Sequence, residues 1–374
     1  MKSSKTGNLA KVVAFFLIAL VLTCTVAFAS SEWQYPTKTP NEPDSGEADE
    51  DKSESGNTDE NTDGQKPPQN DIPVVNPIPD YLHYLTGEEI TQEDAYKRPL
   101  CFVYDTNSAL YGISSSFLTV EIPIENGQTR FLVFSKGVNT GKIGTLAPSR
   151  DYINNIAGSL GGILFCYGND DSFEYSKGNI SAVLNFKEYQ GYHYTEYSQY
   201  PYTNSDLINA FLRNTSTNTV VTQDRNSPYK FVEYFAESKK PLSKANTVII
   251  SHSSVGSTEL NYYSDRGSYV LTKMGQPKVD LLNDKVMEFK NVFLLFSNST
   301  TYETEDATQC VIDTVSGGKG YYMTEGGYEE ITWGYDSFAN LTFFSQDGEK
   351  LTVNRGSSYI SFIKSSDKSK VKIS

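Results

Sequence analysis

The hydrophobic pattern between residues 79 and 243 predicts a mixture of strands and helices. Four short stretches are either continuously apolar or alternate between apolar and polar residues, as buried or half-buried strands do. These predicted strands cover residues 100–104, 117–124, 129–134 and 163–167. Apolar residues with helical spacing predict two helices, one that starts after Pro148 and ends at Gly161 and one over residues 205–213. We expect this part to be a mixed α/β domain.

Beyond about residue 244 the helical period disappears. Turn signals such as Asp265-Arg266-Gly267 and Asp347-Gly348 separate a series of short strand patterns. The predicted strands cover residues 247–251, 259–263, 269–273, 285–296, 310–313, 320–324, 330–333, 341–344 and 359–363. We expect residues 244–366 to form an antiparallel sheet or a partly closed barrel. The predicted fold class is therefore α+β, with a mixed α/β domain over residues 79–243 followed by an all-β antiparallel domain.

Residues 1–29 have the pattern of an export signal. Lysines precede an unbroken apolar run over residues 12–22, and Ala27-Phe28-Ala29 has the small-x-small pattern that a signal peptidase needs. Cleavage after Ala29 is our first interpretation. Lipidation at Cys24 and an uncleaved anchor are the alternatives. All three place the body of the protein outside the cytoplasm.

Residues 30–78 have the composition of a disordered linker. Residues 41–65 hold ten acids and one base, which contribute −9 of the formal charge of −14 that the 374 residues carry. Repulsion between these charges and the lack of aromatic residues keep such a segment solvated and extended. The rest of the chain is therefore only mildly acidic. We expect an acidic stalk that carries a folded body.

Composition excludes several classes of protein. The mean hydropathy of −0.45 is too low for a protein with many membrane spans. Four cysteines are too few for a disulfide-dense scaffold, and three histidines leave little for a metal site rich in imidazole. The basic patch of a nucleic-acid-binding protein is absent. We expect no cofactor and no nucleic-acid partner.

The predicted hairpin around Asn126-Gly127 carries three charged residues. A two-residue turn pairs Pro123 with Arg130, which places Arg130 diagonally to both Glu121 and Glu125 on one face of the sheet. One interpretation is an exposed ion-pair cluster of small energetic value. The other is a rigidly held guanidinium that recognises a carboxylate or phosphate on a partner.

Two further acids follow predicted strands. Asp105 ends the first strand, and Asp170 follows the strand over residues 163–167. Ligands often bind beyond the carboxyl ends of strands in mixed sheets, so these acids could hold a hard cation or form an acid–base pair. Acids at strand ends are also ordinary turn formers.

Other candidate groups have structural explanations of equal or greater weight. Residues 189–202 contain six tyrosines, which suit either contact with a glycan or protein, or packing on the protein's own sheet. His252 lies between serines, which does not make a catalytic triad. Cys101 and Cys166 lie in predicted buried strands and could meet in one sheet, but they fit small buried residues better. We identify no catalytic residue and no metal ligand.

Several segments resemble the YerB-like bacterial lipoproteins, a family with a two-part domain of unknown function. The resemblance covers roughly residues 79–366 and implies an exported two-domain protein. It is carried by Glu121, Glu125 and Thr129-Arg130-Phe131, by Ser149-Arg150-Asp151-Tyr152, and in the second half by Met274-Gly275, Pro277-Lys278, Gly317-Gly318-Lys319-Gly320, Trp333 and Asn354-Arg355-Gly356. Arg150 therefore joins the candidate binding residues. The chain departs from the family pattern at Ala147, Cys166 and Lys278, where relatives carry other ionisable groups.

These observations favour a non-catalytic binding or interaction module on an acidic stalk at the cell envelope. Its partner would be a cell-wall polymer or another envelope protein, with membrane contact only through the N-terminus. The alternative is a carboxylate- or metal-dependent hydrolase that acts on extracellular glycan or cell-wall material.

Overall fold

The fold is described here from a computed structural model of the chain. It describes residues 79–135, 139–168, 183–196, 200–221, 227–252, 256–303 and 308–374. The predicted signal over residues 1–29, the acidic linker and Asp170 lie outside the described residues. In the part that is described, no helix is both long and apolar enough to cross a membrane.

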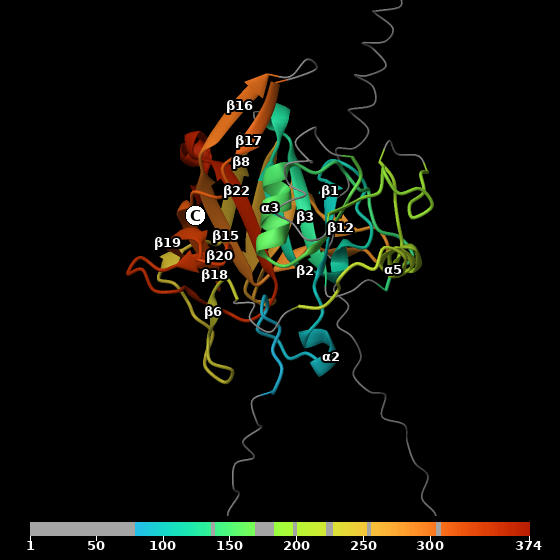
Figure 1. Cartoon of the computed structure of the whole chain (residues 1–374). Coiled ribbons are helices and arrows are strands. Elements are labelled where there is room, and N and C mark those ends of the chain that lie inside the picture. Colours follow the sequence, from blue (N-terminus) through green and yellow to red (C-terminus); the bar gives the residue numbers. More distant parts are fainter. Residues whose placement is uncertain are drawn as a thin grey trace, which may run out of the picture. The chain divides into compact units, whose positions relative to one another are not determined.

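The largest sheet in the described residues has 11 strands and draws on both halves of the chain (Figure 1). Its path runs β20-β19-β18-β15-β22-β2-β3-β1-β4-β5, and β7 pairs with β19. The strands are β1 (Leu100–Asp105), β2 (Ser116–Pro123), β3 (Thr129–Ser135), β4 (Ile163–Cys166), β5 (Val183–Asn185), β7 (Ser243–Lys244), β15 (Asn291–Ser297), β18 (Gly318–Thr324), β19 (Gly327–Tyr335), β20 (Leu341–Phe344) and β22 (Ser358–Lys364). The division near residue 244 stays a prediction, since this one sheet spans it.

A second sheet of 6 strands comes from the later part of the described chain. It follows the order β11-β10-β9-β8-β23, with β14 paired to β10. Its strands are β8 (Thr247–Ser251), β9 (Ser257–Tyr263), β10 (Ser268–Lys273), β11 (Gln276–Pro277), β14 (Glu288–Phe289) and β23 (Lys372–Ile373).

Helices and short strand pairs complete the described body. The helices are α2 (Gln92–Ala95), α3 (Asp151–Ser159) and α5 (Ser205–Asn214), with 3-10 turns η1 (Ile113–Ser115), η2 (Glu125–Gly127) and η3 (Ser365–Lys370). The pairs are β12 (Val279–Asp280) with β13 (Lys285–Val286), β16 (Ser299–Glu303) with β17 (Thr308–Ile312), and β6 (Lys230–Phe231) with β21 (Thr352–Val353).

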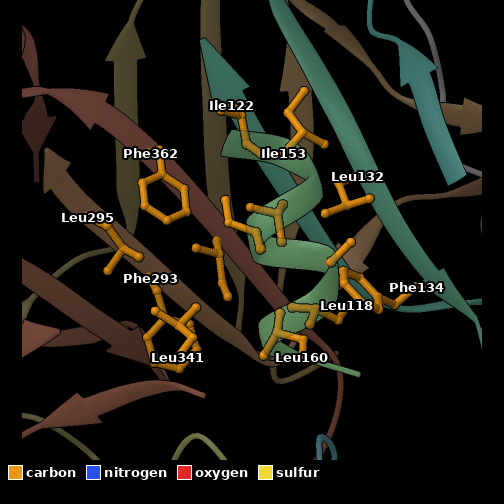
Figure 2. Packing of buried hydrophobic residues seen from close by; sticks show 14 of the residues in the cluster. Leu118, Ile122, Leu132, Phe134, Ile153, Leu160, Phe293, Leu295, Leu341 and Phe362 are labelled. Carbon is orange, nitrogen blue, oxygen red and sulfur yellow. The ribbon is translucent and has the colours of Figure 1, made fainter. Parts of the chain in front are cut away.

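Helix α3 covers one face of the main sheet (Figure 2). Its apolar residues recur with helical spacing, so Ile153 of α3 and Leu160, which caps its C-terminus, point toward the strands and are buried. They pack in one cluster with alternate residues of β2 and β3, among them Leu118 and Leu132. Phe293 of β15 extends the same cluster, so strands from both halves of the chain share this core.

The opposite face of the main sheet forms a second core with the smaller sheet. Phe131 of β3 and Tyr359 of β22 belong to one buried cluster with Val248, Leu260 and Leu271 of β8, β9 and β10. Residues that alternate along each strand therefore serve two different cores. A polar side chain on this second face is carried into the layer between the two sheets.

Most predicted strands and helices agree with those observed, and the described body is mostly β. Two expectations are wrong. The single strand predicted over residues 285–296 is observed as β13, β14 and β15. The second half is not purely antiparallel, because β22 runs parallel to both β15 and β2. All seven residues of β15 are buried. Strands that are covered on both faces suit parallel pairing in the middle of a sheet, because helices or other layers shield each side.

Candidate functional site

A buried carboxylate lies between the two sheets. Glu121 is on the face of β2 that points toward the smaller sheet, and its side chain is 0% exposed. The carboxylate accepts hydrogen bonds from the hydroxyls of Thr129 (2.6 Å), Thr258 (2.8 Å) and Tyr359. Lys273, whose side chain is 6% exposed, donates from Nζ to Glu121 Oε1. We call these five residues the Glu121 cluster.

Each member of the Glu121 cluster comes from a different strand. Thr129 begins β3, Thr258 lies in β9, Lys273 ends β10 and Tyr359 lies in β22. A buried charge is costly unless it is paired and hydrogen-bonded, and the four partners meet that requirement. Lys273 Nζ also lies 2.5 Å from Thr129 Oγ1, so the ammonium is held at two points.

The electrostatics of the cluster favour an ionised Glu121. Burial alone would raise the pKa of its carboxyl, but the Lys273 ammonium and the His252 imidazole outweigh burial and hold the pKa well below its usual range. Burial, together with the Glu121 charge, raises the pKa of Tyr359 well above its usual range. The carboxylate is therefore a fixed negative charge and the phenol a fixed hydrogen-bond donor.

A cavity of about 420 Å³ opens beside this cluster. We call it the Lys278 pocket. It is lined by Asn107, Asn126, Gly127, Gln128, Thr129, His252, Gly256, Lys273, Met274 and Lys278. The described residues that line it include two lysines and a histidine but no aspartate or glutamate. The pocket wall is therefore cationic.

His252 follows the end of β8 and is almost completely buried, with 4% of its side chain exposed. Its Nε2 lies 3.8 Å from Glu121 Oε2, which is beyond hydrogen-bond length. Within the described residues this buried nitrogen has no hydrogen-bond partner. It is a buried polar atom whose bonding capacity is unused.

Lys278 is half-buried and reaches the pocket from the segment between β11 and β12. Its Nζ donates to the backbone oxygen of Thr106, at 2.8 Å. Burial lowers the pKa of Lys278, and the nearby Lys273 ammonium lowers it further. No carboxylate of the described residues lies within ion-pair distance of its Nζ, in contrast to Lys273.

The predicted charged face of the hairpin is wrong in register. Glu125–Gly127 forms a three-residue turn, and the amide of Ile124 donates to Gln128 O across it. Arg130 therefore pairs with Ile122 rather than Pro123, and it lies on the face opposite Glu121. The difference arises because the turn has one residue more than a two-residue hairpin, and each such shift moves every side chain to the other face.

The remaining predicted charged residues form separate ion pairs. Arg130 Nη1 lies 3.2 Å from Asp105 Oδ1, and both side chains are largely buried. Arg150, just before α3, pairs with Glu125. The expected link between Arg130 and Glu125 is therefore replaced by two different partners. Whether Asp170 approaches Asp105 lies outside the described residues.

The described part of the tyrosine-rich stretch packs on the protein itself. The rings of Tyr189 and Tyr192 pack perpendicular to that of Phe211 of α5, with centroids 4.9 Å and 4.8 Å away. Tyr202 holds the Lys142 ammonium 4.1 Å from its ring centroid. These contacts support the packing interpretation for these rings.

The cysteines and possible metal ligands add no further site. Cys101, Cys166 and Cys310 are buried and form no disulfide, which agrees with their interpretation as small core residues. Among the described residues, no group of three or more histidine, cysteine, aspartate or glutamate side chains is placed to hold a metal ion.

Sequence reasoning missed most of the Glu121 cluster. It singled out Glu121, but it placed Thr129 on the core face and attached no role to Lys273, Thr258 or Tyr359. His252 was considered only as part of a serine-rich motif. The one available signal was Lys273, because a lysine that ends a strand with an apolar centre needs a counter-charge if that strand is buried.

Comparison with known proteins places this architecture in a family. Two family models match the chain: the N-terminal domain of "Protein of unknown function (DUF3048)" over residues 85–223, and its C-terminal domain over residues 245–360. The chain belongs to this two-part family, and the resemblance found in the sequence is confirmed.

A solved structure shares the fold. The crystal structure of the YerB protein from Bacillus subtilis is similar, with a TM-score of 0.67 and 19% sequence identity. The match covers 78% of this chain and 99% of that chain. At this identity the likeness shows the fold alone. None of the curated proteins matches the chain.

Proposed function

We propose that this protein is an exported, non-catalytic binding module of the cell envelope. The observation that carries the proposal is the Lys278 pocket, a cationic cavity whose described lining has no acid. Its volume of about 420 Å³ is within the range of small-molecule sites. The partner is a cell-wall polymer or another envelope protein that presents a group to this pocket.

The state of the carboxylates supports binding over hydrolysis. A glycosidase needs one carboxyl that stays protonated, with a raised pKa, to act as an acid. The pKa of Glu121 is lowered instead, and its oxygens are already engaged by the cluster. Asp105 and Glu125 are each held by an arginine. This arrangement suits a rigid scaffold more than proton transfer.

The N-terminal sequence supports an extracytoplasmic location. Residues 1–29 carry the export pattern, and the acidic residues 30–78 would hold the body away from a membrane or wall surface. A reporter that is active only outside the membrane, fused after residue 370, should be active. An inactive fusion would contradict the location, and mass spectrometry of the mature N-terminus separates cleavage from lipidation.

A co-sedimentation assay with isolated cell walls and envelope membranes tests the binding role. The protein should sediment with one of these fractions, and Gln128→Trp should reduce sedimentation because Gln128 is exposed at the pocket wall. Gln346→Trp, an exposed position that does not line this pocket, is the matched control and should sediment like the original protein. Equal loss in both variants, or no sedimentation at all, would refute the proposal.

The same preparation tests the hydrolase alternative. The protein is incubated with cell-wall fragments and chromogenic glycosides, with and without calcium or zinc. Turnover that disappears in Asp105→Asn or Asp170→Asn would replace the binding module with a carboxylate-dependent hydrolase.

A further inference from the structure

The geometry points to a phosphate group as the ligand of the Lys278 pocket, bound by Lys278 Nζ beside the imidazole of His252. This inference rests on the proposed binding function and names the chemical class that the pocket would recognise. It concerns the phosphate itself, which a phosphodiester of a wall polymer and a free phosphate ester have in common.

The charge balance of the pocket calls for an anion. Lys273 is neutralised by Glu121, which lies behind it. Lys278 has only the neutral carbonyl of Thr106 as a hydrogen-bond acceptor among the described residues, and an ammonium has three N–H donors. Glu121 and Asp105 act on Lys278 only from beyond ion-pair distance. A half-buried cation without a direct ion-pair partner is costly, and an oxyanion in the cavity would reduce that cost.

His252 supplies a second, independent indication. Its Nε2 is buried and has no partner among the described residues, although the side chain lines the same cavity as Lys278. Nε2 itself is covered, so a rotation of the ring would bring its N–H to an oxyanion there. Glu121 Oε2, at 3.8 Å, is too distant to take up this hydrogen bond.

The Glu121 cluster explains why the cationic wall stays in place. Lys273 Nζ donates to Glu121 and Thr129, and these two hydrogen bonds keep its ammonium at the cavity wall. The paired lysine contributes little net charge, and Lys278 and His252 are left to contact the ligand. The cluster is therefore a positioning device, and the two pocket residues are the ligand contacts.

The donor types favour phosphate over carboxylate. Arginine binds a carboxylate through two parallel hydrogen bonds from its planar guanidinium, whereas lysine binds phosphate as a point charge. No arginine is among the described residues that line the pocket, and Arg130 lies on the other face of β3. The cavity of about 420 Å³ also leaves room for the substituents of a phosphate ester.

Isothermal titration of the purified protein at low salt tests this inference. The probes are inorganic phosphate, dimethyl phosphate and acetate. Phosphate should bind at one site, and Lys278→Gln should weaken it at least about tenfold, equivalent to about 1.4 kcal/mol. His252→Asn should weaken it in the same direction. Lys319→Gln makes the same charge change at an exposed position outside the pocket and should leave binding unchanged.

Lys278→Arg is the control that separates loss of the charge from a folding defect. It retains the cation, so it should bind phosphate within a few-fold of the original protein. No variant should melt below the original protein, and Lys278→Gln should melt at the same or a higher temperature, because it removes a half-buried cation. Binding of dimethyl phosphate as strong as that of inorganic phosphate would identify a diester as the source. Preference for inorganic phosphate would identify a free phosphate or a monoester.

Three results would overturn the inference: no phosphate binding, an equal loss in Lys319→Gln, or acetate binding as tight as phosphate. The proposed function fails separately. If envelope sedimentation is sensitive to Gln128→Trp but insensitive to Lys278→Gln and to added phosphate, the binding role stands and phosphate recognition falls. If the protein binds phosphate but sediments with no envelope fraction, the envelope role is refuted.

Discussion

Replacement of Glu121 by glutamine should destabilise the protein strongly, because it leaves a buried lysine without its counter-charge. Glutamine has nearly the same shape, so packing is preserved and the change isolates the charge. Lys273, 6% exposed, would lose its only ion-pair partner among the described residues. Removal of one member of a buried ion pair costs about 3–5 kcal/mol of unfolding free energy.

A double-mutant cycle separates the pair from its surroundings. Lys273→Met alone should cost a similar amount, since it leaves Glu121 buried with hydroxyl donors only. The double variant Glu121→Gln/Lys273→Met carries neither charge, so its cost should fall well below the sum of the two single costs. The remaining loss, about 1–3 kcal/mol, reflects hydroxyls of Thr258 and Tyr359 that no longer face a carboxylate.

Urea unfolding followed by circular dichroism measures these differences. Lys97→Met is the matched control, because Lys97 pairs with Glu93 at the surface, with side chains 46% and 80% exposed. Surface pairs contribute about 0–1 kcal/mol, so this variant should unfold almost like the original protein. Single-variant costs at that level, or costs that add within about 0.5 kcal/mol in the cycle, would refute the buried-pair argument.

Four further outcomes are expected. The pKa of Glu121 lies below its ordinary value of 4.5, so the ionised carboxylate stabilises the fold above pH 4.5, and this stability is lost as the pH falls further. Below pH 4.5 the urea midpoint should therefore decline more steeply in the original protein than in Glu121→Gln. If phosphate binds, its affinity should fall as the pH rises through the lowered pKa of Lys278, below the ordinary 10.5, and a fall only above 10.5 would contradict this. Gly162→Ala should destabilise by about 1–3 kcal/mol, because an added Cβ would lie 2.5 Å from Cys101 Sγ, and an unchanged melting temperature would refute that. Burial raises the pKa of the Cys166 thiol to about 12 and that of Cys101 well above its ordinary value, so iodoacetamide should label both only after denaturation, as peptide mass spectrometry would detect.

The positions of most strands and helices could be predicted because they depend on local patterns. The helix expected over residues 205–213 is observed as Ser205–Asn214, and the strand expected over residues 247–251 is observed as Thr247–Ser251. Apolar spacing of 3.6 or 2 residues determines which face of an element is buried, and that information lies within a few residues of sequence.

The register of the hairpin could not be predicted from the Asn126-Gly127 pair alone. Both residues adopt positive φ, of 58° and 69°, as a tight turn requires. The turn nevertheless includes Glu125, whose carboxylate is held by Arg150 from the start of α3. The extra turn residue, Glu125, contacts Arg150 at the start of α3. This one-residue difference places Arg130 on the face of the sheet opposite Glu121.

The acidic composition of residues 41–65 and the positions of most strands follow from the amino-acid order alone. So does the alternation that turns Glu121 away from Arg130 once the register is known. The partners of Glu121 depend on the tertiary fold. Lys273 and Tyr359 lie 152 and 238 residues away along the chain. Lys273 reaches the carboxylate because the two sheets pack face to face, and Tyr359 reaches it because β22 pairs with β2. A buried charge in that layer is stable only where partners from several strands surround it.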